Sequence, residues 1–424
     1  MKQPTVVTLP TGLRMVLAPR AEATTATVLV LVGTGSEYET ASEKGLSHFL
    51  EHMYFKGTVL RPTSRIISSE LDALGAVSNA FTSQEYTGYY AKGNPKHVKT
   101  FIDILGDIYL NATFPETELE KERGVIIEEI NMYEDNHRYK AAETVISLMY
   151  GDQPAGWPTL GTKETVASFS RADFIRYKDT HYHAANTIVV VSGLIDEAAI
   201  QAHVEHVFST INQQPLLTKK PVTIDQDTLR VKVVRRPIDQ AHLAITFHSV
   251  PLGHPDYATA QLLGGILGSG MSARLFQTLR EDLGVAYSVE AGQEGFTDHG
   301  VFGVACGIDK TRVNETLKVL AKEFSLLKEV SVSTEELNKA REYMLSMMRI
   351  GLETTDEVAG FYGGQLILGQ PLRTPEMITE HYMAVTPEMI LHVARRLFVA
   401  THATVVLVGP FESTDLDTSP LSSL

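Results

Sequence analysis

The sequence predicts an α+β protein built from two homologous αβ domains, each with a mixed or antiparallel sheet packed with helices. Segments with apolar residues at every second position are typical of strands, and they are mixed with helical patterns of about 12 or more residues rather than arranged as regular βαβ units. The two halves also end alike, with "AANTIVVVSG" at 184–193 and "ATHATVVLVG" at 400–409. This agreement indicates an internal duplication.

A chain of 424 residues is long enough for two domains. Between the halves, residues 213–228 are rich in polar side chains and contain Pro215 and Pro221, which is typical of a linker. We therefore expect a first domain at 1–212, a linker at 213–228 and a second domain at 229–424.

Alternating apolar and polar residues at 1–20 predict two strands joined by a turn at the start of the first domain. Further strands are expected within "TATVLVLVGTGSEYE" at 25–39 and "HYHAANTIVVVSGLI" at 181–195. The second domain should begin with strands in 229–250 and continue into helical "DYATAQLLGGILGSGMSARLFQTLRED" at 256–282.

Composition and charge exclude several classes of protein. The formal net charge of −14 leaves little basic surface to neutralise phosphates, so we expect no nucleic-acid partner and no anionic membrane partner. No apolar run approaches the roughly 20 residues that span a bilayer, and the N-terminus lacks a signal-peptide core, which favours the cytoplasm. Cys306 is the only cysteine, so an intrachain disulfide and a cysteine-based zinc site are excluded.

The stretch "GLSHFLEHMYFKGT" at 45–58 contains an HxxEH motif. His48 and His52 are about 400° apart around a helix and so share one face, with Glu51 close to that face. Two imidazoles at this spacing can bind one Zn²⁺, and Glu51 can then take a proton from metal-bound water. A helix with two hydrogen-bonded histidines is the alternative that this pattern leaves open.

A catalytic zinc requires a third protein ligand, and "ETELEKERGVIIEEINMYEDN" at 116–136 provides acidic candidates on a predicted helix. We expect its apolar residues Val125, Ile126 and Ile130 to form a buried stripe. Seven residues apart, Glu122 and Glu129 lie on one face, whereas Glu128 points about 100° away. Glu129 is then the candidate third ligand and Glu122 a carboxylate that holds an imidazole N–H. An exposed acidic helix face is the alternative.

Together, HxxEH and the later "ERGVIIEE" resemble the pitrilysin-type inverzincin family of zinc metallopeptidases, which includes insulin-degrading enzyme and the mitochondrial processing peptidase. The segments "HFLEHMYFKGT" and "EEINMYED" are similar to bacterial members, although Thr11 stands where the family usually has Asn. The length is that of the half-size processing-protease branch, in which each subunit forms half of a clamshell.

The resemblance implies that His48, His52 and Glu129 bind one zinc ion per chain. It also implies that Glu51 is the general base and that Glu122 supports a ligand.

Within "SNAFTSQEYTGYY" at 78–90, the resemblance implies a substrate-binding edge strand in which Asn79, Ala80 and Phe81 lie beside an extended peptide. An exposed strand edge binds peptides through main-chain hydrogen bonds with little demand on their sequence. A strand that is simply part of a sheet is the alternative.

In the second half, "LREDLGVAY" resembles the segment whose Arg and Tyr reach the substrate carbonyl, here Arg280 and Tyr287. These donors would stabilise the oxyanion of the tetrahedral intermediate from the opposite wall of the clamshell, and hence from a partner subunit. An arginine on a solvated helix face and a tyrosine in a strand are the alternative.

The resemblance as a whole implies a zinc-dependent endopeptidase that cleaves oligopeptides or unstructured polypeptide segments inside a closed chamber. We expect a homodimer, or a heterodimer with a homologous subunit. The alternative function is a non-catalytic subunit of the same fold that supports a peptidase heterodimer or a respiratory complex.

Overall fold

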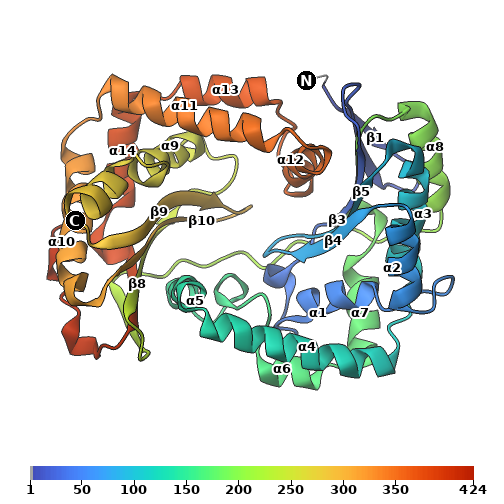
Figure 1. Ribbon diagram of the computed structural model, residues 1–424, viewed down its shortest axis with the longest axis horizontal. Helices are drawn as coiled ribbons and strands as arrows, with labels where there is room; N and C mark the ends of the chain where they lie inside the picture. The colour runs from blue at the N-terminus through green and yellow to red at the C-terminus, as the bar shows by residue number, and fades with distance from the viewer. Residues whose placement is uncertain (1–2) are drawn as a thin grey trace. The chain divides into compact units, whose positions relative to one another are not determined.

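The computed structural model describes residues 3–424, which divide into two compact units (Figure 1). The first unit contains the described residues up to Ile130 together with Trp157–Lys220 and Ile350–Thr374. The second contains Asn131–Gly156, Pro221–Arg349 and Pro375–Leu424. None of the helices in the described part of the chain is both long and apolar enough to cross a membrane.

The first unit is built on a mixed sheet with the strand order β1-β2-β6-β3-β5-β4. Its strands are β1 (Thr5–Thr8), β2 (Arg14–Pro19), β3 (Ala26–Val32), β4 (Val77–Thr82), β5 (Thr87–Gly93) and β6 (Thr187–Gly193). β2 runs parallel to β6, and the other neighbouring strands are antiparallel. β4 is therefore an edge strand, paired on one side with β5.

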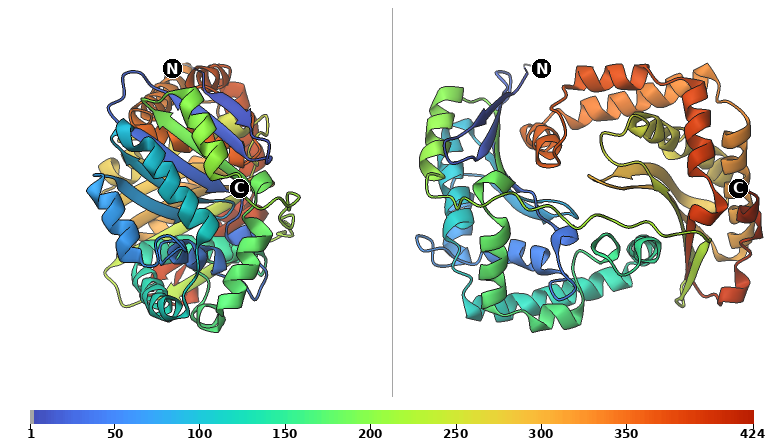
Figure 2. Two further views of the ribbon diagram at one scale, coloured as in Figure 1. Left: turned by 90° about the vertical axis from the view of Figure 1, so that its right-hand side faces the viewer. Right: turned by 180° about the vertical axis from the view of Figure 1, so that it is seen from behind.

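Helices cover both faces of this first sheet, as the views in Figures 1 and 2 show. The helices of the first unit are α1 (Leu46–Tyr54), α2 (Ser64–Ala73), α3 (Val98–Asn111), most of α4 (Glu116–Asp135), α6 (Lys163–Ser168), α7 (Arg171–His181), α8 (Glu197–Val207) and α12 (Thr355–Ile367). Val28 and Val30 of β3 belong to the core that includes residues of α1 and α3. Leu29 and Leu31 point to the other face, where α12 packs on β3 and β6. All seven residues of β3 are buried as a result.

The second unit repeats this arrangement with the strand order β7-β11-β8-β10-β9. Its strands are β7 (Arg230–Arg235), β8 (Gln240–Ser249), β9 (Ala286–Gly295), β10 (Gly300–Asp309) and β11 (Ala403–Gly409). β11 lies parallel to β7 and antiparallel to β8, just as β6 lies parallel to β2 and antiparallel to β3. The two segments whose sequences agree thus take equivalent places, which is the relation that an internal duplication predicts.

The second sheet is also covered on both faces. The helices of the second unit are α5 (His137–Tyr150), α9 (Tyr257–Gly268), α10 (Val313–Glu329), most of α11 (Thr334–Gly351), α13 (Pro375–Met383) and α14 (Pro387–Leu397). One face forms a large core in which Cys306 is 3% exposed, and burial raises the pKa of its thiol to about 12. On the other face, Ala141 and Val145 of α5 pack against Ala244 and Val406.

Each sheet is covered on its second face by a helix from the other half of the chain. α5 precedes the linker but packs on the second sheet, whereas α12 follows the linker but packs on the first. The units therefore differ from the expected division into 1–212 and 229–424 in these two segments. The expected division assigned each helix to a domain by its order in the chain. In the structure, an apolar sheet face is covered by whichever helix can reach it.

α12 approaches the first sheet closely because it has a glycine at the contact. A Cβ on Gly363 would lie 2.6 Å from Leu31 Cδ1 and 2.9 Å from Val190 Cγ2, whereas a Cβ on the exposed Gly360 would meet no atom within 4 Å. We expect Gly363→Leu to lower the free energy of unfolding by about 1–3 kcal/mol through overpacking. Gly360→Leu should raise it by up to about 1 kcal/mol, because leucine favours a helix more than glycine does.

Denaturant unfolding followed by circular dichroism measures both changes. Equal effects of the two substitutions would show that α12 does not pack on the sheet through Gly363.

Candidate metal centre

Helix α1 carries the HxxEH motif and begins at Leu46, directly after its N-cap residue Gly45. Gly45 has a φ of 89°, and a Cβ there would lie 2.4 Å from the carbonyl oxygen of Leu160, so only glycine fits this start. The carboxylate of buried Glu39 accepts hydrogen bonds from the backbone N–H of Gly45 at 2.8 Å and of Ser47 at 2.7 Å. Burial raises the pKa of Glu39 to about 8, against the opposing effect of these two bonds. The first turn of α1 is thus held by a buried side chain.

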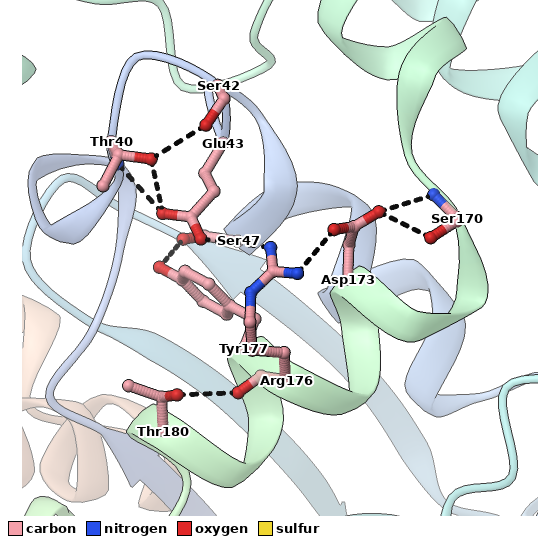
Figure 3. A network of polar contacts seen from close by, with 9 residues as sticks. All are labelled: Thr40, Ser42, Glu43, Ser47, Ser170, Asp173, Arg176, Tyr177 and Thr180. Carbon is pink, nitrogen blue, oxygen red and sulfur yellow. Dashed lines mark hydrogen bonds and ion pairs between the residues drawn. The ribbon is translucent and has the colours of Figure 1, made fainter.

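The same end of α1 is joined to α7 by a network of polar contacts (Figure 3). The hydroxyl groups of Ser47 and Tyr177 lie 2.7 Å apart. Arg176 of α7 donates to Asp173 at 2.7 Å and lies 3.4 Å from a carboxylate oxygen of Glu43, just before α1. These contacts fix the residues immediately before His48 against a second helix.

Helix α4 runs from Glu116 to Asp135 and presents its acidic residues as the helical phase predicts. Glu122 is 7% exposed, whereas Glu128 faces solvent. Of the expected apolar stripe, Ile126 is fully buried and Ile130 packs against the same core, but Val125 is 51% exposed. The expectation for Val125 was wrong because α4 covers α1 with one narrow face, and Val125 lies about 100° from Ile126 around the helix.

Three side chains from α1 and α4 converge on one point. Glu129 Oε2 lies 3.6 Å from His48 Nε2 and 3.7 Å from His52 Nε2, and one candidate ligand atom from each residue lies within 4.8 Å of the others. Both distances are longer than hydrogen bonds. Ligand atoms around a tetrahedral Zn²⁺ with bonds of 2.0–2.1 Å are about 3.4 Å apart, so the spacing fits one such ion. Glu129 is thus placed as a third ligand would be, without a hydrogen bond to either ring.

The two imidazoles differ in their surroundings. Burial, and next the neighbouring His52, lowers the pKa of His48 to about 3, so its ring is neutral at pH 7 and able to bind a cation through Nε2. Burial alone would lower the pKa of His52, but its hydrogen bond to Glu122 and the nearby carboxylates raise it. His48 Nδ1 is buried and, among the described residues, has no hydrogen-bond partner.

Glu122 orients His52 as the sequence predicts. Its Oε1 lies 2.8 Å from His52 Nδ1, which leaves Nε2 of the ring turned toward Glu129. Its Oε2 lies 2.5 Å from Lys56 Nζ, one turn after His52. Burial would raise the pKa of Glu122, but the hydrogen bonds from His52 and Lys56 lower it. Lys56 was missed in the sequence, where its spacing of four residues from His52 was the available signal.

Glu51 lies beside the three candidate ligands but does not belong to their group. It is 9% exposed, and its Oε2 accepts a hydrogen bond of 2.6 Å from the hydroxyl of Thr82 in β4. Burial raises the pKa of Glu51, and the bond from Thr82 opposes the rise. A carboxylate with a raised pKa next to a candidate metal site is suited to accept and return a proton.

The expected substrate strand at 78–90 is a hairpin. β4 ends at Thr82 and the chain turns back into β5 at Thr87, so only the first part of the segment is an edge strand. The expectation treated the segment as one strand, although the consecutive polar residues Ser83, Gln84 and Glu85 were the available signal for a turn. Asn79, Ala80 and Phe81 all lie in β4, where Asn79 and Phe81 are exposed and Ala80 packs against the core.

Arg280 and Tyr287 lie in the second unit, whereas the histidines and Glu129 belong to the first. Arg280 is in a π-helical turn (Phe276–Asp282), and its Nη1 donates to the carbonyl oxygen of Tyr287 at 3.2 Å. Its guanidinium also lies over the ring of Phe276, 5.0 Å from the centroid. The side chain of Tyr287 in β9 is 70% exposed. The two residues thus form one local group at the start of β9.

Two family descriptions match the chain. "Insulinase (Peptidase family M16)" matches residues 14–163, and "Peptidase M16 inactive domain" matches residues 168–344. The chain is 34% identical to an uncharacterized zinc protease of Bacillus subtilis (strain 168), YmxG, over 94% of this chain and 96% of that protein. It is 31% identical to an uncharacterized zinc protease of Streptomyces coelicolor, over 96% of this chain and 89% of the other.

Two solved structures share the fold. A protease from Helicobacter pylori superposes with a TM-score of 0.90 at 23% identity, covering 96% of this chain and 99% of the other. A chain of Complex III2 from Candida albicans superposes with a TM-score of 0.86 at 18% identity, covering 99% of both chains.

We expect the isolated protein to bind one zinc ion through His48, His52 and Glu129. Glu129→Gln should lower the zinc content sharply because it removes a ligand charge, whereas Glu128→Gln on the neighbouring, exposed position should leave it unchanged. Elemental analysis of protein dialysed against a trace of free zinc measures both. A loss of zinc in Glu128→Gln but not in Glu129→Gln would contradict the assignment.

Proposed function

The chain belongs to peptidase family M16, and from this we propose that it is a zinc-dependent endopeptidase that cleaves oligopeptides or unstructured polypeptide segments. The observation that carries the proposal is the convergence of His48, His52 and Glu129, with Glu51 beside them. A fold alone does not imply an activity, whereas this set of side chains has one well-defined chemistry.

Each candidate site residue of the first unit has its own role in the proposed reaction. His48, His52 and Glu129 would hold the zinc ion, which when bound would act as a Lewis acid that polarises the scissile carbonyl. Glu51 takes the proton of the attacking water and returns it to the leaving amine. Glu122 keeps the ring of His52 oriented through its Nδ1.

Substrate binding is proposed at the free edge of β4. An extended peptide can add to this edge through main-chain hydrogen bonds, alongside Asn79, Ala80 and Phe81. Because such bonds are independent of side chains, the enzyme should accept many sequences provided that the segment is unfolded. The net charge of −14 is consistent with peptide substrates and gives no reason to propose a nucleic-acid or membrane partner. The cytoplasmic location stays a prediction.

A second candidate function is a non-catalytic subunit of the same fold in a peptidase heterodimer or a respiratory complex. The likeness to a chain of Complex III2 favours it. Against it, the chain retains all three candidate ligands and the candidate base, and these side chains are grouped in one place. We therefore favour the enzyme.

Glu51→Gln should keep the fold and the zinc but lower peptide hydrolysis by at least about 10²-fold, the usual contribution of a general base. Glutamine has the same shape and remains polar, but it cannot accept the proton. Cleavage of a quenched fluorescent peptide, measured beside the zinc content, tests the expectation. Near-normal turnover in this variant, with contaminating peptidases excluded, would remove Glu51 from the mechanism and leave the second candidate function favoured.

We also propose that two chains pair, most simply as a homodimer, so that a closed chamber forms and each active site is composite. The zinc residues would come from one chain, and Arg280 and Tyr287 of the other would stabilise the oxyanion. Folded proteins would be poor substrates, because a closed chamber admits only short or unfolded chains.

Mixing inactive Glu51→Gln chains with inactive Arg280→Ala chains tests this arrangement. If subunits exchange, mixed dimers should recover hydrolysis at one of their two sites, where an intact zinc half meets an intact Arg280. Mixed dimers that are demonstrated by mass spectrometry but stay inactive would show that Arg280 does not act across the interface.

A further inference from the structure

Thr82 is the last residue of β4, and its hydroxyl donates the 2.6 Å hydrogen bond to Glu51 Oε2. We propose that Thr82 is a positioning residue, which sets the orientation of the Glu51 carboxylate relative to a peptide bound along β4. The inference rests on the proposed peptidase function and deepens it. It assigns to one strand two tasks, which are to align the substrate and to hold the base.

Successive side chains of β4 point to opposite faces, so different parts of the strand can perform the two tasks. Residues 77, 79 and 81 face solvent, whereas 78, 80 and 82 are partly buried on the face that contacts α1. The side chain of Thr82 therefore points toward the helix that carries Glu51, while the backbone edge of β4 stays free for a peptide. A shift of the strand would move the substrate and the base together.

The bond from Thr82 matters because a hydrogen bond is directional, whereas the burial of Glu51 is not. Within residues 3–424, Thr82 provides the only hydrogen bond to its carboxylate. A glutamate side chain has three rotatable bonds, so without this donor the carboxylate can leave the one orientation that serves the reaction. With Oε2 engaged, Oε1 is the oxygen left to meet water.

Thr82 is itself held by the turn that follows it. Ser83 N–H donates to the Tyr86 carbonyl at 2.9 Å, and Ser36 N–H donates to the Ser83 carbonyl at 3.2 Å. Gly35 permits this approach, since a Cβ there would lie 2.1 Å from the Ser83 carbonyl oxygen.

The linker adds a further attachment to the same turn. The ammonium group of Lys219 lies 2.7 Å from Glu85 in the turn and also pairs with Glu37. Both carboxylates are almost completely buried, so the attachment excludes solvent. Because these contacts hold Thr82 in place, its hydroxyl can determine the orientation of the Glu51 carboxylate instead of adapting to it.

The test compares Thr82→Val, Thr82→Ser and the wild type. Valine has the shape of threonine without the hydroxyl, and serine keeps the hydroxyl. We expect kcat for peptide hydrolysis to fall by about 10-fold to 100-fold in Thr82→Val, the scale of a hydrogen bond to a charged group. KM and zinc content should change by less than about twofold, and Thr82→Ser should restore most of kcat. Crystal structures of both variants should show the Glu51 carboxylate displaced only in Thr82→Val.

Thr87→Val is the matched control. Thr87 is the cross-strand partner of Thr82, but its hydroxyl donates to the Thr34 carbonyl at 2.9 Å. This variant should lose stability and keep kcat. A fall in kcat in Thr87→Val equal to that in Thr82→Val would reduce Thr82 to a structural role and overturn the inference.

Unchanged kcat in Thr82→Val would overturn the inference as well, while the proposed function would stand if Glu51→Gln is inactive. A wild-type protein that binds zinc but cleaves no peptide would overturn the proposed function first and the inference with it.

Discussion

Glu122 lies two helical turns before Glu129 on α4, and its carboxylate joins His52 and Lys56 of the segment that carries the HxxEH motif. This contact determines how α4 is rotated about its own axis and where it lies along that axis relative to α1. Because residues seven apart on a helix lie nearly above one another, fixing Glu122 on His52 also directs Glu129 toward the open nitrogens of both imidazoles. The ligand that completes the candidate metal centre therefore depends on a pairing about 10 Å away along the helix axis.

The other parts of the centre are attached to the same frame by separate contacts. Glu39 and Tyr177 hold the start of α1, and Thr82 connects Glu51 to the edge strand. These polar contacts accompany the apolar core that joins α1 to the sheet, and Tyr177 belongs to both. The core brings the elements together to within a few ångströms, and the hydrogen bonds then select one orientation of each functional group, because a buried polar group without a partner is costly.

The sequence was sufficient for what depends on local periodicity. Helical phase placed Glu122 and Glu129 on one side of α4 and Glu128 on another, and the repeated strand before each closing glycine indicated the duplicated sheets. It was insufficient for two long-range contacts that no motif marks. The exchange of α5 and α12 depends on which helix reaches an uncovered sheet face, and the bond from Thr82 joins a strand to a helix that precedes it. Neither leaves a periodic signal in the chain.

Fold and activity therefore depend on different residues in this protein. The faces of β3 and β8 are packed with their covering helices through apolar side chains, so this packing does not require the candidate ligands or the base. A fold alone therefore does not imply an activity. The activity depends on the side chains that meet between α1, α4 and β4, and in this chain they include three candidate zinc ligands and a candidate base.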